Sequence, residues 1–252
     1  MSFRKIKNIQ VINESNELMS FKEKYGDLSD CIFEGDLYIG NQNLNSLEGC
    51  PIEIYGSFNC EENNLTNLIG GPQKILKDFN CSGNSLKNLV GGPISVGGLY
   101  SCDKNNLRSL EGAPEKAHSF DCHNNRLETL KYAPKTIAGS LYCEANMLKD
   151  FIGGPEVIGG DCICDYNKLE SFIGFPENGA DKITCSNNSL SILGMQPLLI
   201  SMALSYHRFC IADIVTDCNP VDLAKEVNRI NSLRDKLNRD REKIEKTLRL
   251  LK

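Results

Sequence analysis

The cysteines are the most prominent chemical feature of this 252-residue chain. Seven of the twelve recur at steps of 20 or 21 residues, at Cys60, Cys81, Cys102, Cys122, Cys143, Cys164 and Cys185. Such thiols can form disulfides in an oxidising compartment or bind zinc in a reducing one. Zinc-binding pairs have two to four intervening residues, whereas the closest pair here, Cys162 and Cys164, has one. The spacing therefore predicts buried, reduced cysteines that pack as small apolar groups. It leaves the exposure of Cys31, Cys50, Cys210 and Cys218 open.

Other residues capable of catalysis are scattered. The three histidines, His118, His123 and His207, form no triad and no metal-binding pattern in the sequence. The chain contains no P-loop, no G-x-G-x-x-G and no G-x-S-x-G motif. We therefore expect a protein that is not an enzyme and that has no cofactor and no metal site.

Each ladder cysteine belongs to a longer repeated frame. An apolar residue stands two positions before it, an Asn three after, a Leu five after, a second large apolar residue eight after and a Pro twelve after. An earlier copy uses Ile39 in place of Cys and Gln42 in place of Asn. In-register copies at this period indicate a solenoid, so residues 37–204 are predicted to form eight coils.

The consensus F-x-C-x-x-N-x-L-x-x-L-x-G-x-P resembles the leucine-rich repeat. Its length is similar to that of the short bacterial type, and Gly-Pro-rich, Cys-bearing repeats of this kind occur in large tailed phages and some bacteria. The resemblance implies a protein-binding role, such as a phage-encoded inhibitor or adaptor of a host defence protein. Related bacterial effectors often carry a ubiquitin-ligase domain with a catalytic Cys. Here the segment around Cys210 and Asp213 is too short for one.

One coil can be derived from residue alternation. In the segment 57–61, a period of two directs Phe58 and Cys60 inward and the residues between them outward. The Asn can bond the backbone of neighbouring coils, the two Leu positions fill the interior, and Pro favours an extended return. We expect an α/β-repeat solenoid that is mostly β, in the form of a leucine-rich-repeat horseshoe with parallel strands and an extended convex side.

The two ends depart from the repeat. Residues 1–36 are predicted to cap the first coil, with a helix-like stretch over 13–26 that Gly26 ends. Residues 205–219 are a C-terminal cap or linker, and 220–252 an amphipathic helix that starts after Asn219. This helix folds back on the solenoid, binds a partner or forms a homodimer. The residues assigned to oligomerisation are Leu223, Ile230, Leu233, Leu237, Ile244, Leu248 and Leu251.

Charge is distributed unevenly along the chain. The formal net charge is −5, but residues 220–252 carry ten basic and six acidic residues, net +4, which leaves −9 for 1–219. An acidic body argues against general nucleic-acid binding. No apolar run reaches the roughly 18 residues of a membrane span, and the N-terminus does not resemble a signal peptide. We therefore expect a cytoplasmic protein without a membrane partner, in the host cytoplasm if it is phage-encoded.

The outward positions of the strands form the predicted concave binding face. Carboxylates dominate it, and a few apolar side chains lie among them, as in a protein-binding patch for a basic surface. Two alternatives are a face that is acidic only for solubility, and a structural protein that assembles through its helix. The residues assigned to this face are Glu61, Asp78, Leu99, Asp103, Asp121, His123, Tyr142, Glu144, Asp161, Ile163 and Asp165.

Overall fold

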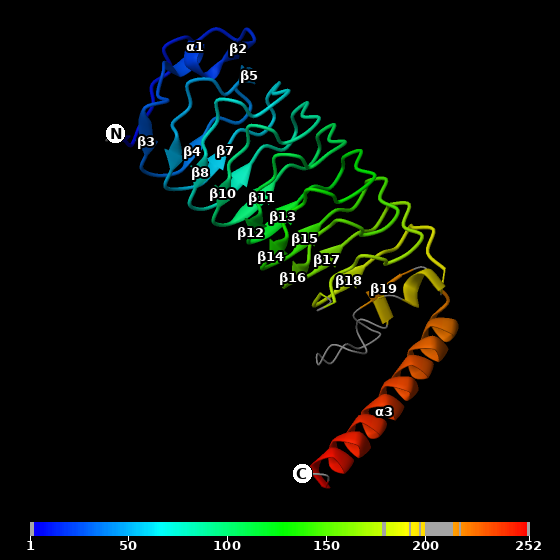
Figure 1. Cartoon of the computed structure of the whole chain (residues 1–252). Helices are drawn as coiled ribbons and strands as arrows, with labels where there is room; N and C mark the ends of the chain where they lie inside the picture. Colours follow the sequence, from blue (N-terminus) through cyan, green and yellow to red (C-terminus); the bar gives the residue numbers. More distant parts are fainter. Residues whose placement is uncertain are drawn as a thin grey trace.

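The computed structural model shows a parallel β-solenoid of about eight turns, followed by one long C-terminal helix (Figure 1). It describes residues 3–177, 180–191, 193–196, 198–199, 214–216 and 218–250. Successive coils stack along one axis, so that most of each coil lies between its two sequence neighbours. The fold is therefore the predicted mostly β solenoid.

Eight strands of a nine-stranded parallel sheet are the predicted strands of the eight coils, and the ninth falls within residues 205–219, where a cap or linker was expected. Phe58 pairs with Phe79, and Phe79 with Tyr100, so equivalent residues stack in register. Phe58 and Cys60 are fully buried, which confirms the predicted alternation. In spatial order the strands are β4 (Leu37–Tyr38), β7 (Phe58–Asn59), β9 (Phe79–Asn80), β11 (Leu99–Ser101), β13 (Ser119–Asp121), β15 (Leu141–Tyr142), β17 (Cys162–Ile163), β18 (Ile183–Thr184) and β19 (Ile214–Val215).

A second line of strands lies on the return side of the coils, where only an extended return was expected. Six of these strands follow a Pro, and each of the six ends on a buried apolar residue three positions after it, such as Ile54, Ile75 and Ile137; the two strands nearest the N-terminus precede the first Pro. Burial of that residue fixes the return against the core, and the backbone then pairs with the coil before it. The strands are β1 (Arg4–Ile6), β3 (Cys31–Phe33), β6 (Glu53–Ile54), β8 (Lys74–Ile75) and β10 (Ser95–Val96) in one sheet, and β12 (Lys116–Ala117), β14 (Thr136–Ile137) and β16 (Val157–Ile158) in another.

The core consists of rows of identical positions. The aromatic row stacks Phe58 on Phe79 with ring centroids 5.8 Å apart, and Tyr100 lies 4.9 Å from Phe79 and 5.4 Å from Phe120. The ladder cysteines and the first Leu of each repeat run beside this row and are almost completely buried, except for the partly buried Leu190 of the last repeat. Phe, Tyr, aliphatic and Cys side chains thus fill the interior of a chain that lacks Trp.

The N-terminal helix is shorter than predicted. α1 spans only Phe21–Tyr25, because Ser20 and Glu23 form a capping box that starts the helix there. Gly26 follows it with a φ of 87°, and its N–H bonds to Lys22 O, so the predicted end is correct. The preceding strand β2 (Met19–Ser20) pairs with β5 (Leu44–Ser46). Phe21 and Tyr25 lie in the same buried cluster as the first coils.

The C-terminal helix α3 spans Pro220–Leu250, and the Asn219 side chain accepts the Val221 N–H at its start. Leu223 and Ile230 are buried in the chain's own core cluster, and Gln196 donates to Glu226 on the same part of the helix. These two residues of the predicted oligomerisation stripe therefore face the solenoid and not a partner. Leu233 is half exposed. The side chains of Leu237, Ile244 and Leu248, and the whole of Leu251, lie outside the described residues.

Candidate binding face

Three rows of side chains form the outer face of the nine-stranded sheet. The first row precedes the buried aromatic position, the middle row lies between that position and Cys, and the last row follows Cys. Of the predicted site residues, the first row holds Asp78, Leu99 and Asp161; the middle row Asp121, Tyr142 and Ile163; the last row Glu61, Asp103, His123, Glu144 and Asp165. The repeat thus brings all eleven to one face.

An amide ladder fixes the edge of this face. In the third full repeat, the Nδ2 atom of Asn105 donates to Cys81 O at 3.0 Å, Cys102 O at 3.2 Å and Asp103 O at 3.1 Å. Its Oδ1 accepts the Leu86 N–H at 3.0 Å. One side chain therefore bridges two adjacent coils, as predicted, and sets the backbone that carries the last row.

A left-handed turn comes immediately before each amide. The residue two after Cys has a positive φ in every coil, for example 49° at Lys104, 50° at Asn124 and 53° at Ala145. This turn sends the chain away from the strand, so the residue after Cys stands at the end of its strand. The sequence signals the turn only in part, because four of the eight coils use Gly or Asn there, at Asn41, Gly83, Asn124 and Asn187, and the others use residues that do not favour a positive φ.

Most carboxylates of the face already have partners within the chain. Asp78 accepts the backbone N–H of Leu99 at 2.8 Å, so it holds the next coil in place. Glu61 accepts from Asn80 at 2.6 Å, and Asp165 accepts from Thr184 at 2.5 Å. The face is thus less free for a ligand than its composition suggests.

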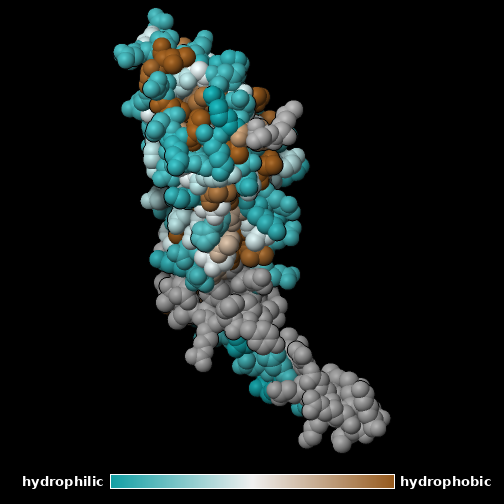
Figure 2. Space-filling view, turned by 90° about the vertical axis from the view of Figure 1, so that its left-hand side faces the viewer, coloured by the Kyte–Doolittle hydropathy of each residue, from teal (hydrophilic) through white to brown (hydrophobic). Residues whose placement is uncertain are grey.

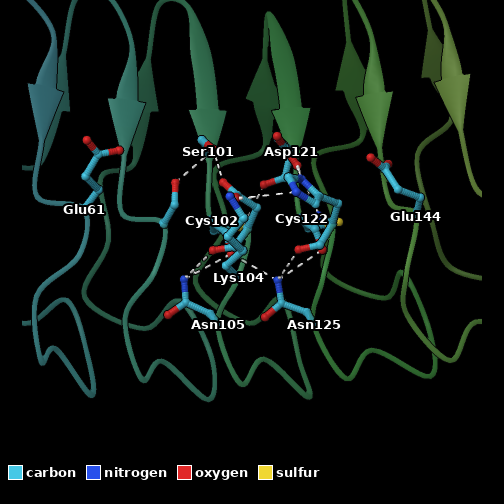
Figure 3. A network of polar contacts seen from close by, with 12 residues as sticks. Glu61, Ser101, Cys102, Lys104, Asn105, Asp121, Cys122, Asn125 and Glu144 are labelled. Atoms are coloured by element: carbon cyan, nitrogen blue, oxygen red, sulfur yellow. Dashed lines mark hydrogen bonds and ion pairs between the residues drawn. The ribbon is translucent and has the colours of Figure 1, made fainter.

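The polar network continues toward the middle of the face (Figure 3). Ser82 bonds to Asn80, and its Oγ lies 3.4 Å from the Oγ of Ser101. Ser101 donates to Asp103 Oδ1 at 2.7 Å, and both residues are buried. Asp103 was predicted to be an exposed contact residue, but only 6% of it is accessible because its neighbours in adjacent coils cover it.

His123 lies between two carboxylates. Its Nδ1 is 2.7 Å from Asp121 Oδ1, and its Nε2 is 3.6 Å from Asp103 Oδ2. Burial raises the pKa of the Asp121 carboxyl, although the contact with His123 opposes this effect. Asp103 belongs to one coil and Asp121 and His123 to the next, so that about 20 positions of sequence separate residues that meet in the fold.

Glu144 is the next member of the last row. Its Oε2 is buried and has no hydrogen-bond partner among the described residues. Burial raises the pKa of its carboxyl most, a hydrogen bond from its own backbone and the nearby His123 lower it, and Asp121 and Asp165 raise it by smaller amounts. Glu144 is therefore a face carboxylate with one buried oxygen that no described residue satisfies.

The apolar residues assigned to the face are Leu99, Tyr142 and Ile163, all partly exposed, and Tyr38 at the N-terminal end of the middle row is exposed as well. Tyr142 and Ile163 are paired in register on β15 and β17, whereas Leu99 lies two coils before Tyr142. A further exposed apolar set, away from this face, follows the second large apolar residue of the repeat at Ile69, Ile152 and Ile173. Figure 2 shows such hydrophobic groups scattered along a mainly hydrophilic surface.

Most of the described thiols are buried. All seven ladder cysteines, and Cys31, Cys50 and Cys162, are buried. Burial raises the pKa of Cys164 to about 12, so its thiolate is scarce at neutral pH. Cys218 is partly exposed, and Cys210 and His207 lie outside the described residues.

No protein-family model matches the chain, and no curated protein is detectably similar to it in sequence. Within the described part of the chain, no helix combines the length and the apolar character that crossing a membrane requires.

Proposed function

We propose that the chain is a non-enzymatic, protein-binding solenoid of the leucine-rich-repeat kind, capped at its N-terminus by residues 1–36. Its strand face engages a basic protein surface in the cytoplasm. The phage-type repeats favour a phage-encoded inhibitor or adaptor that acts on a host defence protein.

One observation carries this proposal. Tyr142 and Ile163 stand side by side on adjacent strands, partly exposed, and Glu144 and Asp165 flank them in the last row. A rigid apolar pair beside acidic groups is the composition of a protein-binding centre with a charged rim. The parallel strands hold the pair in a fixed geometry, which reduces the entropy lost on binding.

The experiment compares face variants in affinity capture from a host lysate. Tyr142→Ala with Ile163→Ala removes the apolar pair, whereas Ile152→Ala with Ile173→Ala removes two exposed apolar residues elsewhere. A partner retained by the wild type and the control, and lost by the face variant, supports the proposal. Glu144→Lys should then slow association and weaken its salt dependence, because electrostatic attraction acts mainly on the association rate. Equal capture by all variants would reject the face as the binding surface.

The alternative function is self-assembly through α3. The described structure favours it at one point: Leu233 is exposed on a helix whose first turns are already anchored by Leu223 and Ile230. Truncation at Asn219 would remove this anchor as well, so it cannot separate the two roles. Leu233→Asp with Leu237→Asp leaves the anchor intact. A dimeric wild type that becomes monomeric in this variant, measured by light scattering, would favour assembly.

A further inference from the structure

The middle of the strand face contains a group of three potential metal ligands. One atom each from Asp103, Asp121 and His123 lie within 4.8 Å of one another, and no other such group occurs in the described part of the chain. Asp103 is buried, and the other two are partly buried. Asp121 ends strand β13, and Asp103 and His123 stand two residues beyond the ends of β11 and β13, so the paired strands fix their positions.

The hydrogen bond to Asp121 defines how the imidazole is protonated. An ionised carboxylate only accepts hydrogen bonds, so the Nδ1 of His123, 2.7 Å from Asp121 Oδ1, carries a proton. The backbone N–H of His123 also donates to the same oxygen, at 3.1 Å. In the neutral ring, Nε2 therefore presents its lone pair on the opposite side. That side faces Asp103.

Nε2 and Asp103 Oδ2 are 3.6 Å apart, which is too far for a good hydrogen bond. Two lone-pair donors that face each other at this separation repel each other unless a positive charge lies between them, either a proton on Nε2 or a metal ion. Two metal–ligand bonds of about 2.1 Å at a tetrahedral angle span about 3.4 Å, close to the observed separation. We propose that His123 Nε2 and Asp103 Oδ2 bind a divalent transition-metal cation, with Asp121 orienting the imidazole.

A second observation in the neighbouring coil is the buried oxygen of Glu144. Glu144 follows His123 in the last row; its side chain is partly exposed, but its Oε2 is buried and finds no hydrogen-bond donor among the described residues. A buried acceptor without a donor often indicates a missing ion or water. A metal ion with two protein ligands keeps positions for water, and a metal-bound water would supply a strong donor on this side of the group.

The local charge also favours a cation. Asp103, Asp121 and Glu144 are carboxylates, and the one ion-pairing lysine beside them is Lys104, whose Nζ is 3.7 Å from Asp103 Oδ2. Its side chain is 62% exposed, so it can move aside at little cost. An imidazole ligand selects zinc or a similar transition metal over magnesium and calcium, which prefer oxygen alone. A His ring that donates its second N–H to a carboxylate is a common support for zinc.

The experiment measures binding of Zn²⁺ to the full chain by titration calorimetry after treatment with a chelator. We expect one equivalent per chain, with a dissociation constant in the micromolar range. Asp103→Asn and His123→Gln should weaken binding at least tenfold, and Asp121→Asn by roughly 10- to 100-fold, as for other residues that orient a metal-binding imidazole. The matched controls are His118→Gln, an exposed His, and Asp78→Asn, a carboxylate of the first row; neither should change the affinity.

Two measurements avoid dependence on variants that fold poorly. Zn²⁺ should shift the ring-proton NMR signals of His123 in the wild type and leave those of His118 unchanged. Co²⁺ used in place of Zn²⁺ should show ligand-field bands without thiolate charge-transfer absorption. The proposal is overturned if the protein does not bind Zn²⁺ at a tenfold molar excess of metal over protein, or if Asp103→Asn and His123→Gln bind Zn²⁺ as tightly as the wild type does. It is also overturned if the Co²⁺ spectrum shows thiolate charge-transfer absorption. These outcomes do not depend on whether the face binds a protein.

Discussion

Replacement of Asn105 by Ala tests the amide ladder that holds the coils together. The change removes four hydrogen bonds, but their energetic consequences differ. Cys81 O keeps a bond from Asn84, Cys102 O keeps one from Asn125, and Asp103 O keeps the backbone N–H of Gly83. The Leu86 N–H, by contrast, has no acceptor other than Asn105 Oδ1 among the described residues.

A buried N–H without a partner costs roughly 1–3 kcal/mol, and the three weakened carbonyls add to this. We expect Asn105→Ala to lower the free energy of unfolding by about 2–4 kcal/mol. At about 2–4 °C per kcal/mol for a chain of this size, the melting temperature should fall by roughly 5–15 °C. Circular dichroism during heating measures this shift.

Asn64→Ala is the matched control, because the Asn64 side chain is exposed and its one hydrogen bond within the described residues is to the exposed side chain of Asn43, at 2.7 Å. It should lower stability by less than about 0.5 kcal/mol. Asn105→Asp tests the direction of the amide, since a carboxylate can accept from Leu86 but turns its second oxygen toward three carbonyls. It should destabilise at least as much as Ala at neutral pH. Equal melting temperatures for Asn105→Ala and Asn64→Ala would refute the role assigned to the ladder.

Three further substitutions test the core and the turns. Cys122→Ser should lower the free energy of unfolding by roughly 1–3 kcal/mol, because it buries a hydroxyl. The ladder thiols should react with a polar thiol reagent only after unfolding. Fast labelling of the native protein, detected by mass spectrometry, would contradict their burial. Tyr100→Phe should raise stability by about 1 kcal/mol, because the Tyr100 hydroxyl is buried and has no hydrogen-bond partner among the described residues; a lower melting temperature would show that it is satisfied. Tyr132→Gly should also raise stability by about 1 kcal/mol, since Tyr132 has a φ of 70° where six other coils use Gly; no gain on chemical denaturation would mean that its side-chain contacts compensate.

The fold was largely predictable because the repeat frame consists of residues that every coil uses in the same way. The inward Phe58 and Cys60 positions and the bridging Asn follow from alternation and from the need to satisfy buried backbone groups. The second line of strands was missed, although the apolar residue three after each Pro was visible in the sequence. The early part of the predicted N-terminal helix was wrong, because the local capping box at Ser20 overrides a weak helical pattern.

The candidate site was predictable only as a face. Period two placed Asp103, Asp121, His123 and Glu144 outward, but not the hydrogen bonds among them. Burial of Asp103 depends on the close approach of adjacent coils, and the inward or outward direction of a residue within its own coil does not reveal that approach. A metal-binding pattern was also invisible, since the proposed ligands are 20 residues apart and meet only through the strand register.

The residues that break the repeat carry the functional argument. Strand stacking places equivalent side chains about 4.8 Å apart, so like charges on consecutive coils repel each other. Neutral Ser82 separates Glu61 from Asp103 in the last row, and His123 separates Asp103 from Glu144, whereas Glu144 and Asp165 are adjacent. Burial is the main reason that the pKa of the Glu144 carboxyl is raised; His123 on one side lowers this pKa, and Asp165 on the other side raises it by a smaller amount. A positive group from outside the chain, whether a metal ion or a basic partner, would relieve the repulsion at this point of the face.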